Sequence, residues 1–138
     1  AHRKEQDILT GAVPSKMLSI PSFKGIKVNS PIKYFDGDFT SFNIDGVIVD
    51  AIFTPGHSEG SVTYVLRNYY RIFSGDTVFK GSVGRTDLPT GNFVDIINSI
   101  TNKLMKLPKE TIVYPGHGKS TMIKEEEPIY LELRAKDY

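Results

Sequence analysis

Two turns in this sequence share one pattern, an apolar segment followed by Pro-Gly-His, and they constrain the fold more than any other feature. The first is Ala51-Ile-Phe-Thr-Pro-Gly-His57 and the second is Thr111-Ile-Val-Tyr-Pro-Gly-His117. Short apolar runs predict buried strands, and Pro-Gly marks a turn. Each imidazole is therefore expected on a loop directly beyond a strand, where a rigid element fixes its position.

A third strand end of this kind carries a carboxylate. The segment Tyr70-Arg-Ile-Phe73 is expected to be a short strand, and it leads into Ser-Gly-Asp76, where the glycine permits a sharp turn. The residues between His57 and Asp76 are enough for about one out-and-back hairpin. Both side chains are therefore expected at the same rim of a sheet.

Imidazole nitrogens and carboxylate oxygens are the usual ligands of zinc, iron or manganese at catalytic sites that keep a position open for water. The chain has three histidines, and two of them stand in the paired turns. The alternative for each is an ordinary surface or hydrogen-bonded histidine, but the duplication favours a metal site. We predict that His57, Asp76 and His117 are metal ligands.

Four segments resemble the later motifs of metallo-β-lactamase-fold hydrolases, and of their glyoxalase II-like (hydroxyacylglutathione hydrolase-like) branch in particular. The resemblance extends from about Ile48 to Glu127, and its motifs are Thr54–Ser61, Ser74–Phe79, Gly81–Pro89 and Val113–Gly118. It implies an α+β fold, an αββα sandwich with a metal site at one edge of its two sheets. It also implies that His57 holds a first metal, that His117 holds a second, and that Asp76 bridges both.

The early His-x-His-x-Asp-His motif, which supplies most ligands in that family, does not occur in this sequence. We expect residues 1–138 to form a single domain that matches the C-terminal portion of a family domain, without its N-terminal strands. Such a portion is expected to leave an open sheet edge and exposed apolar surface. Its expected partners are therefore the missing N-terminal segment or a second copy of the chain.

Composition excludes several classes of function. Lys and Arg number 17 against 16 Asp and Glu, so the charge gives no reason to expect binding to nucleic acid or to an anionic membrane. Cysteine is absent, which excludes disulfides and thiolate ligands. No apolar run approaches the roughly 20 residues of a membrane span, and no signal-peptide pattern opens the chain. A cytoplasmic protein with a small-molecule substrate is expected.

Periodicity predicts the remaining elements. Asp-Gly turns separate apolar runs and indicate an antiparallel meander. An irregular loop over residues 12–30 carries apolar side chains that either shape a substrate pocket or cover the core. The last helix starts near Lys124, and Glu125–Glu127 are interpreted as a solvated face or first turn. The other predicted elements are helices over residues 1–9 and 91–107, and strands over residues 32–35, 39–44, 47–53, 61–67, 69–73 and 111–114.

Two charged residues lie close to the predicted ligands. Arg85 follows Gly84 in a loop near Asp76, and by the resemblance this loop faces the substrate. Its guanidinium suits a substrate carboxylate, although an arginine that ties down the glycine-rich loop is the alternative. Glu59, two residues beyond His57, fits a capping or solvent-exposed role better than that of a general base.

The expected chemistry is hydrolysis, because a divalent metal lowers the pKa of bound water from about 15.7 to near 7 and polarises a carbonyl. The resemblance implies a metal-dependent hydrolase of a thioester such as a hydroxyacyl-glutathione. It would use one or two zinc ions, with iron or manganese as alternatives, and this chain alone is expected to be inactive. Two other hypotheses stay open, an iron-dependent persulfide dioxygenase, suggested by Gly84-Arg-Thr-Asp87, and a non-catalytic fragment or binding module.

Overall fold

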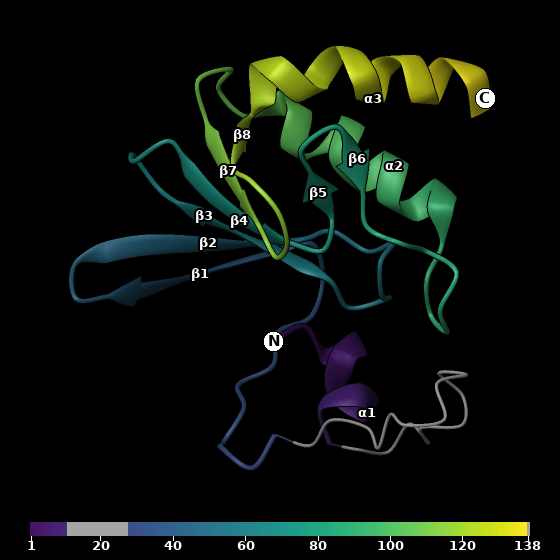
Figure 1. The fold of residues 1–138 in the computed structure, drawn as a ribbon. Coiled ribbons are helices and arrows are strands. Elements are labelled where there is room, and N and C mark those ends of the chain that lie inside the picture. Colours follow the sequence, from purple (N-terminus) through teal and green to yellow (C-terminus); the bar gives the residue numbers. More distant parts are fainter. Residues whose placement is uncertain (11–27, 138) are drawn as a thin grey trace.

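A six-stranded sheet with two helices against one of its faces forms the frame of this structure (Figure 1). The structure is a computed structural model that describes residues 1–10 and 28–137. Most of the predicted loop over residues 12–30 lies outside the described residues. The strands follow the order β1 (Phe39–Ile44), β2 (Val47–Phe53), β3 (Val62–Leu66), β4 (Arg71–Gly75), β7 (Ile112–Pro115) and β8 (Thr121–Met122), and β5 (Val78–Phe79) pairs with β6 (Ser82–Val83) in a separate hairpin.

The strand directions bring three loops to one rim. β1 to β4 pair antiparallel through successive hairpins, so β2 and β4 run in the same direction. β7 pairs with β4 in parallel, which requires a crossover connection, and the segment with β5, β6 and helix α2 (Phe93–Asn102) provides it. The loops that follow β2, β4 and β7 therefore all leave the sheet at the same end.

Helix α2 packs its apolar stripe on the sheet. Asn92 caps it, because the Asn92 side chain accepts a hydrogen bond from the Asp95 amide at 2.9 Å. The prediction of one helix over residues 91–107 is wrong at its C-terminal end, since α2 stops at Asn102 and a 3₁₀ turn, η3 (Leu104–Lys106), follows. Lys103 leaves helical geometry there, and its ammonium donates to the Phe53 carbonyl at 2.5 Å. The 3₁₀ turn still directs Leu104 inward, which explains why the sequence stripe continues past the helix.

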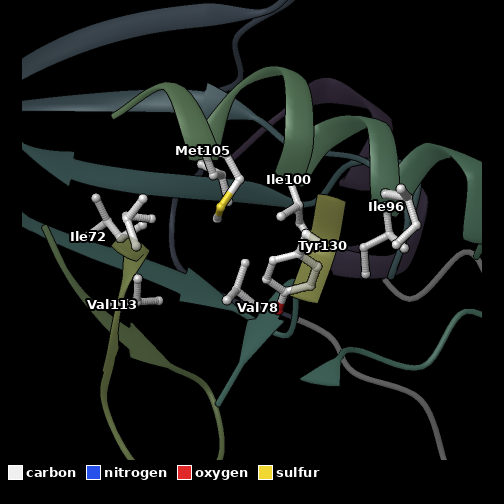
Figure 2. Close-up of a cluster of buried hydrophobic side chains, with 10 residues drawn as sticks. Ile72, Val78, Ile96, Ile100, Met105, Val113 and Tyr130 are labelled. Atoms are coloured by element: carbon white, nitrogen blue, oxygen red, sulfur yellow. The ribbon is translucent and has the colours of Figure 1, made fainter. Parts of the chain in front are cut away.

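The core lies between the sheet, α2, the β5–β6 hairpin and helix α3 (Ile123–Asp137). Figure 2 shows side chains from all four meeting in this space. Full burial of one large aliphatic side chain stabilises a fold by about 1.5–3 kcal/mol. The cluster comprises Ile72, Val78, Ile96, Ile97, Ile100, Leu104, Met105, Val113, Ile123 and Tyr130.

The last helix differs from its prediction in one residue that matters. The Glu125–Glu127 run is interpreted above as a solvated face or first turn, and Glu125 and Glu126 do lie in the first turn of α3, but Glu126 is only 2% exposed. It is buried because this side of α3 faces the β5–β6 hairpin, and the Glu126 carboxylate accepts a hydrogen bond from the Gly81 amide. The glutamate run therefore has one member inside the protein.

The N-terminal segment lies on the other side of the sheet from α2 and α3 (Figure 1). The predicted helix is present as a 3₁₀ turn, η1 (Arg3–Glu5), continued by α1 (Gln6–Leu9). The predicted strand over residues 32–35 is wrong, because Phe35 pairs with His2 in an isolated bridge and η1 then turns the chain away. His2 is buried with its ring stacked on Phe53 at 4.0 Å.

The sheet face opposite the core carries exposed apolar side chains. Phe42, Ile44, Phe73 and Tyr114 are 41%, 54%, 44% and 38% exposed. The predicted exposed apolar surface is thus confirmed. None of the helices in the described ranges combines the length and the apolar character that a membrane crossing requires.

Candidate metal centre

Three turns deliver their side chains to the shared rim of β2, β4 and β7. The Nε2 atom of His57 lies 3.3 Å from Oδ2 of Asp76, and the Nε2 atom of His117 lies 3.5 Å from Oδ1 of the same carboxylate. The structure thus brings the three predicted ligands together. Each imidazole faces its own oxygen of Asp76, which is the arrangement of a carboxylate shared between two cations.

The orientation of His57 leaves its outer nitrogen available. Its Nδ1 atom lies 2.8 Å from the carbonyl oxygen of Arg85. A carbonyl can only accept, so Nδ1 carries a proton and Nε2 is the atom that can bind a metal or a second proton. Holding a histidine through its other nitrogen in this way fixes the ring and its tautomer, as is usual around metal ligands.

The interatomic distances fit a metal centre with shared ligands. An unprotonated Nε2 that faces a carboxylate oxygen is repelled unless a positive charge lies between the two atoms. Two ligand atoms of a tetrahedral zinc ion, with bonds of about 2.0–2.2 Å, are about 3.4 Å apart. The separations of 3.3 and 3.5 Å at Asp76 match this value.

The donor set is nevertheless incomplete for either metal. Within residues 1–10 and 28–137, no three or more His, Cys, Asp or Glu side chains form a group that could hold one ion. The reason is visible in the geometry, because the two imidazoles lie against different oxygens of Asp76. A catalytic zinc usually has three protein ligands. His57, Asp76 and His117 therefore fit part of a dinuclear centre, and their role as ligands stays a prediction.

Close packing around Asp76 explains two glycines of the motifs, Gly84 and Gly116. A Cβ atom on Gly116 would lie 2.5 Å from Oδ1 of Asp76, and the Gly116 amide donates to the Gly75 carbonyl at 2.7 Å. A Cβ atom on Gly84 would collide with the carbonyl oxygen of Asp76. Each position needs a residue without a side chain, since another part of the backbone or a ligand occupies that space.

The environments of the two histidines differ. The His57 side chain is 27% exposed and Asp76 is 31% exposed, whereas the His117 side chain is 78% exposed. Apart from Asp76, a ring contact to His117 comes from Phe79, with the ring centres 6.0 Å apart in an edge-on arrangement. His57 is thus the more firmly held ligand candidate of the two.

Arg85 contributes to the site through its backbone. Its guanidinium forms two hydrogen bonds of 2.8 Å to Asp87, and these bonds lower the pKa of Asp87 to about 2. This pairing ties the loop, as the alternative interpretation of Arg85 expected, while its role in substrate binding stays a prediction. The Arg85 carbonyl that orients His57 was missed, because no sequence signal marks a backbone oxygen.

A second supporting residue, Glu5, was also missed by sequence reasoning. Its carboxylate accepts hydrogen bonds from the Ser58 hydroxyl and, at 2.9 Å, from the Gly60 amide. Glu5 thereby fixes the loop that follows His57, beside a hollow of about 260 Å³ that reaches Asp76. Glu59 lies exposed in the same loop and its amide donates to the Thr90 hydroxyl, so its side chain lies on the surface of this turn.

The sheet with helices on one face, and the turns that carry His57, Asp76 and His117 at one rim, agree with the fold that the sequence motifs predicted. Residues 3–117 match the family model described as the metallo-beta-lactamase superfamily. The chain belongs to this superfamily, as the sequence motifs predicted.

The curated relatives are longer proteins. The chain is 39% identical over 105 residues to the probable metallo-hydrolase YqgX of Bacillus subtilis, covering 75% of this chain and 50% of that protein. It is 33% identical over 97 residues to the hydroxyacylglutathione hydrolase GloC of Haemophilus influenzae, covering 70% of this chain and 46% of that protein. The chain spans about half the length of the curated relatives it matches, which agrees with the predicted correspondence to one portion of a family domain.

Solved structures share the fold. The BLEG-1 B3 metallo-beta-lactamase superposes with a TM-score of 0.79 at 36% identity, over 92% of this chain and 60% of that one. TTHA1623 in a di-iron-bound form superposes with a TM-score of 0.73 at 30% identity, over 91% of this chain and 60% of that one. ETHE1 from Myxococcus xanthus superposes with a TM-score of 0.62 at 32% identity, over 77% of this chain and 44% of that one.

Proposed function

We propose that this chain forms the metal-bridging half of a hydrolase whose substrate is a thioester such as a hydroxyacyl-glutathione. The observation that carries the proposal is the position of Asp76, whose two oxygens each face one imidazole. The likeness to a relative named hydroxyacylglutathione hydrolase supports the substrate class. Zinc is the metal we propose, with iron or manganese as alternatives, and the di-iron form of TTHA1623 shows that a related fold binds iron.

The residues of this chain have distinct tasks in this proposal. When bound, the metals supply an activated water and polarise the carbonyl under attack. His57 and His117 each hold one metal, and Asp76 holds both. The Arg85 carbonyl keeps the proton of His57 on Nδ1, so that Nε2 stays a ligand. The Arg85 guanidinium, exposed at the loop surface, is proposed to meet a substrate carboxylate.

The proposal is tested on the full-length natural protein by elemental analysis and by hydrolysis of lactoylglutathione. We expect bound zinc and thioester hydrolysis in the wild type. Asp76→Asn should lower the rate at least about 100-fold, since it removes the charge that both metals share. The Arg85→Ala variant should raise KM and leave kcat within about threefold, because a positioning charge acts mainly on binding. A wild-type protein that binds no metal would refute the proposal.

A second candidate is an iron-dependent persulfide dioxygenase. It is favoured by the Gly84–Asp87 segment, in which Arg85 and Asp87 form the pair described above, and by the 32% identity to ETHE1 from Myxococcus xanthus. Oxygen consumption with glutathione persulfide, measured beside the iron content, separates it from the hydrolase. A non-catalytic binding module is the third candidate, and it predicts neither reaction.

The place of action and the partners also belong to the proposal. We propose a cytoplasmic location, since nothing in a chain without cysteine requires an oxidising compartment. We propose that the exposed apolar sheet face, which includes Phe42, Phe73 and Tyr114, is covered by an N-terminal segment or by a second copy of the chain. Cell fractionation and the mass of the protein in solution test these two points.

A further inference from the structure

Glu126 is a buried carboxylate that connects two separate segments. It is 2% exposed, on the side of α3 that faces the β5–β6 hairpin. Its Oε2 and Oε1 atoms accept the Gly81 amide at 3.0 and 3.2 Å, and Oε1 accepts the Thr121 hydroxyl at 2.6 Å. Gly81 lies in the turn of the β5–β6 hairpin, and Thr121 opens β8. One side chain thus joins the hairpin to the last strand of the sheet.

Each of these segments is adjacent to part of the metal centre. The hairpin starts two residues after Asp76 and leads directly into Gly84 and Arg85, whose carbonyl orients His57. On the other side, Thr121 pairs with Val113 in β7, the strand that leads to His117. Glu126 therefore lies between the element that follows Asp76 and the loop that carries His117.

Tyr130, one turn further along α3, also binds the β5–β6 hairpin. Its ring is fully buried in the core (Figure 2), and its hydroxyl donates to the Ser82 carbonyl at 2.7 Å. Burial, and secondarily the charge of Glu126, raises the pKa of Tyr130, so the hydroxyl stays a donor across the physiological range. Two side chains of α3 thus hold Gly81 and Ser82, two consecutive residues of the hairpin.

The hydrogen bonds of Glu126 matter because its carboxylate is buried away from water. A buried carboxylate is costly unless hydrogen bonds compensate for lost water, and bonds to a charged acceptor are the stronger kind. Removing the carboxylate leaves the Gly81 amide and the Thr121 hydroxyl without this acceptor. The hairpin and β8 would then lose the side chain that joins them directly.

We propose that Glu126, supported by Tyr130, is a positioning residue that sets the separation between Asp76 and His117 and thereby the affinity of the second metal. The inference rests on the proposed dinuclear hydrolase. His57 and the first metal depend on it less, because Glu5 also fixes the loop of His57, and the hairpin reaches His57 only through the Arg85 carbonyl. Loss of Glu126 should therefore affect the two metals unequally.

The test is a stepwise cobalt titration of the full-length natural protein, followed by visible absorption, together with thermal unfolding. We expect Glu126→Ala to weaken binding of the second equivalent about 10–100-fold, the range found for residues that orient ligands. The first equivalent should change by less than about threefold. Glu126→Gln should lie between Ala and wild type, because its amide oxygen keeps one acceptor while its NH₂ group cannot accept.

Glu125→Gln is the matched control, because Glu125 is exposed on the same turn of α3 and Thr121 already gives its hydroxyl proton to Glu126. It should bind both equivalents as the wild type does. If Glu126→Ala does not fold, Glu126→Gln and Tyr130→Phe provide the measurement, and each should weaken the second equivalent selectively.

The outcomes separate the two proposals. Equal weakening of both equivalents, or no weakening in any variant, would overturn the inference while the hydrolase proposal stands. A wild-type protein that binds one equivalent would also overturn it. A wild type that binds no metal would overturn the proposed function, and the inference with it.

Discussion

Replacing Gly116 by alanine tests whether the turn that carries His117 needs a residue without a side chain. A Cβ atom there would lie 2.5 Å from Oδ1 of Asp76. Since non-bonded heavy atoms rest at about 3.5–4.0 Å, the carboxylate or the turn has to move by about 1 Å. A displacement of about 1 Å at a reacting site costs about 100-fold in rate. The second metal should be lost first, because the clash falls on the oxygen that faces His117.

The assay compares metal content, cobalt absorption, thioester hydrolysis and thermal unfolding in the full-length protein. The Gly118→Ala variant is the control, because Gly118 has φ +79° but nothing within 4 Å of an added Cβ. It should lose about 1–2 kcal/mol of stability through backbone strain and keep both metals. Gly116 does not have a positive φ, so an alanine at this position would perturb the site only through the contact of its Cβ atom and not through backbone strain. A Gly116→Ala protein with wild-type metal content and rate would refute this reasoning.

Three further predictions concern the pH dependence of stability and the completeness of the metal site in this chain. Hydrogen bonds from Arg67 lower the pKa of Asp50, so the stability that they contribute is present above about pH 4 and is lost as the pH falls. In urea unfolding, the Asp50→Asn variant should therefore be less stable than the wild type at pH 7 and equally stable near pH 2. Burial raises the pKa of Tyr130, so its contribution is full below about pH 10 and falls above it; the stability difference between wild type and Tyr130→Phe should shrink at alkaline pH, and a constant difference would contradict the assignment. Residues 1–138 alone should bind zinc weakly and hydrolyse thioesters no faster than their His57→Ala variant; stoichiometric metal with turnover would show that the site is complete.

Local patterns in the sequence were sufficient to predict most of the elements. The Asp45-Gly46 turn predicted the β1–β2 hairpin, and the Pro-Gly-His turns predicted two imidazoles beyond strands, because these features depend on residues that are neighbours in the chain. The apolar stripe predicted α2 but extended it to residue 107, since a 3₁₀ turn can present Leu104 to the core as a helix does. Residues 32–35 have strand composition, yet only one of them finds a bridge partner.

The supports of the candidate site were decided by tertiary structure alone. Glu5 reaches the loop after His57 across 53 residues of sequence, and the Arg85 carbonyl reaches His57 across 28. Glu125, Glu126 and Glu127 look equivalent as letters, but only the middle one is fully buried, because the face of α3 that meets the hairpin is fixed by packing. The sequence by itself determined which residue types stand at the strand ends. The distances between those ends, and the buried groups that hold them, depend on contacts between distant segments that form only when the sheet and its helices come together.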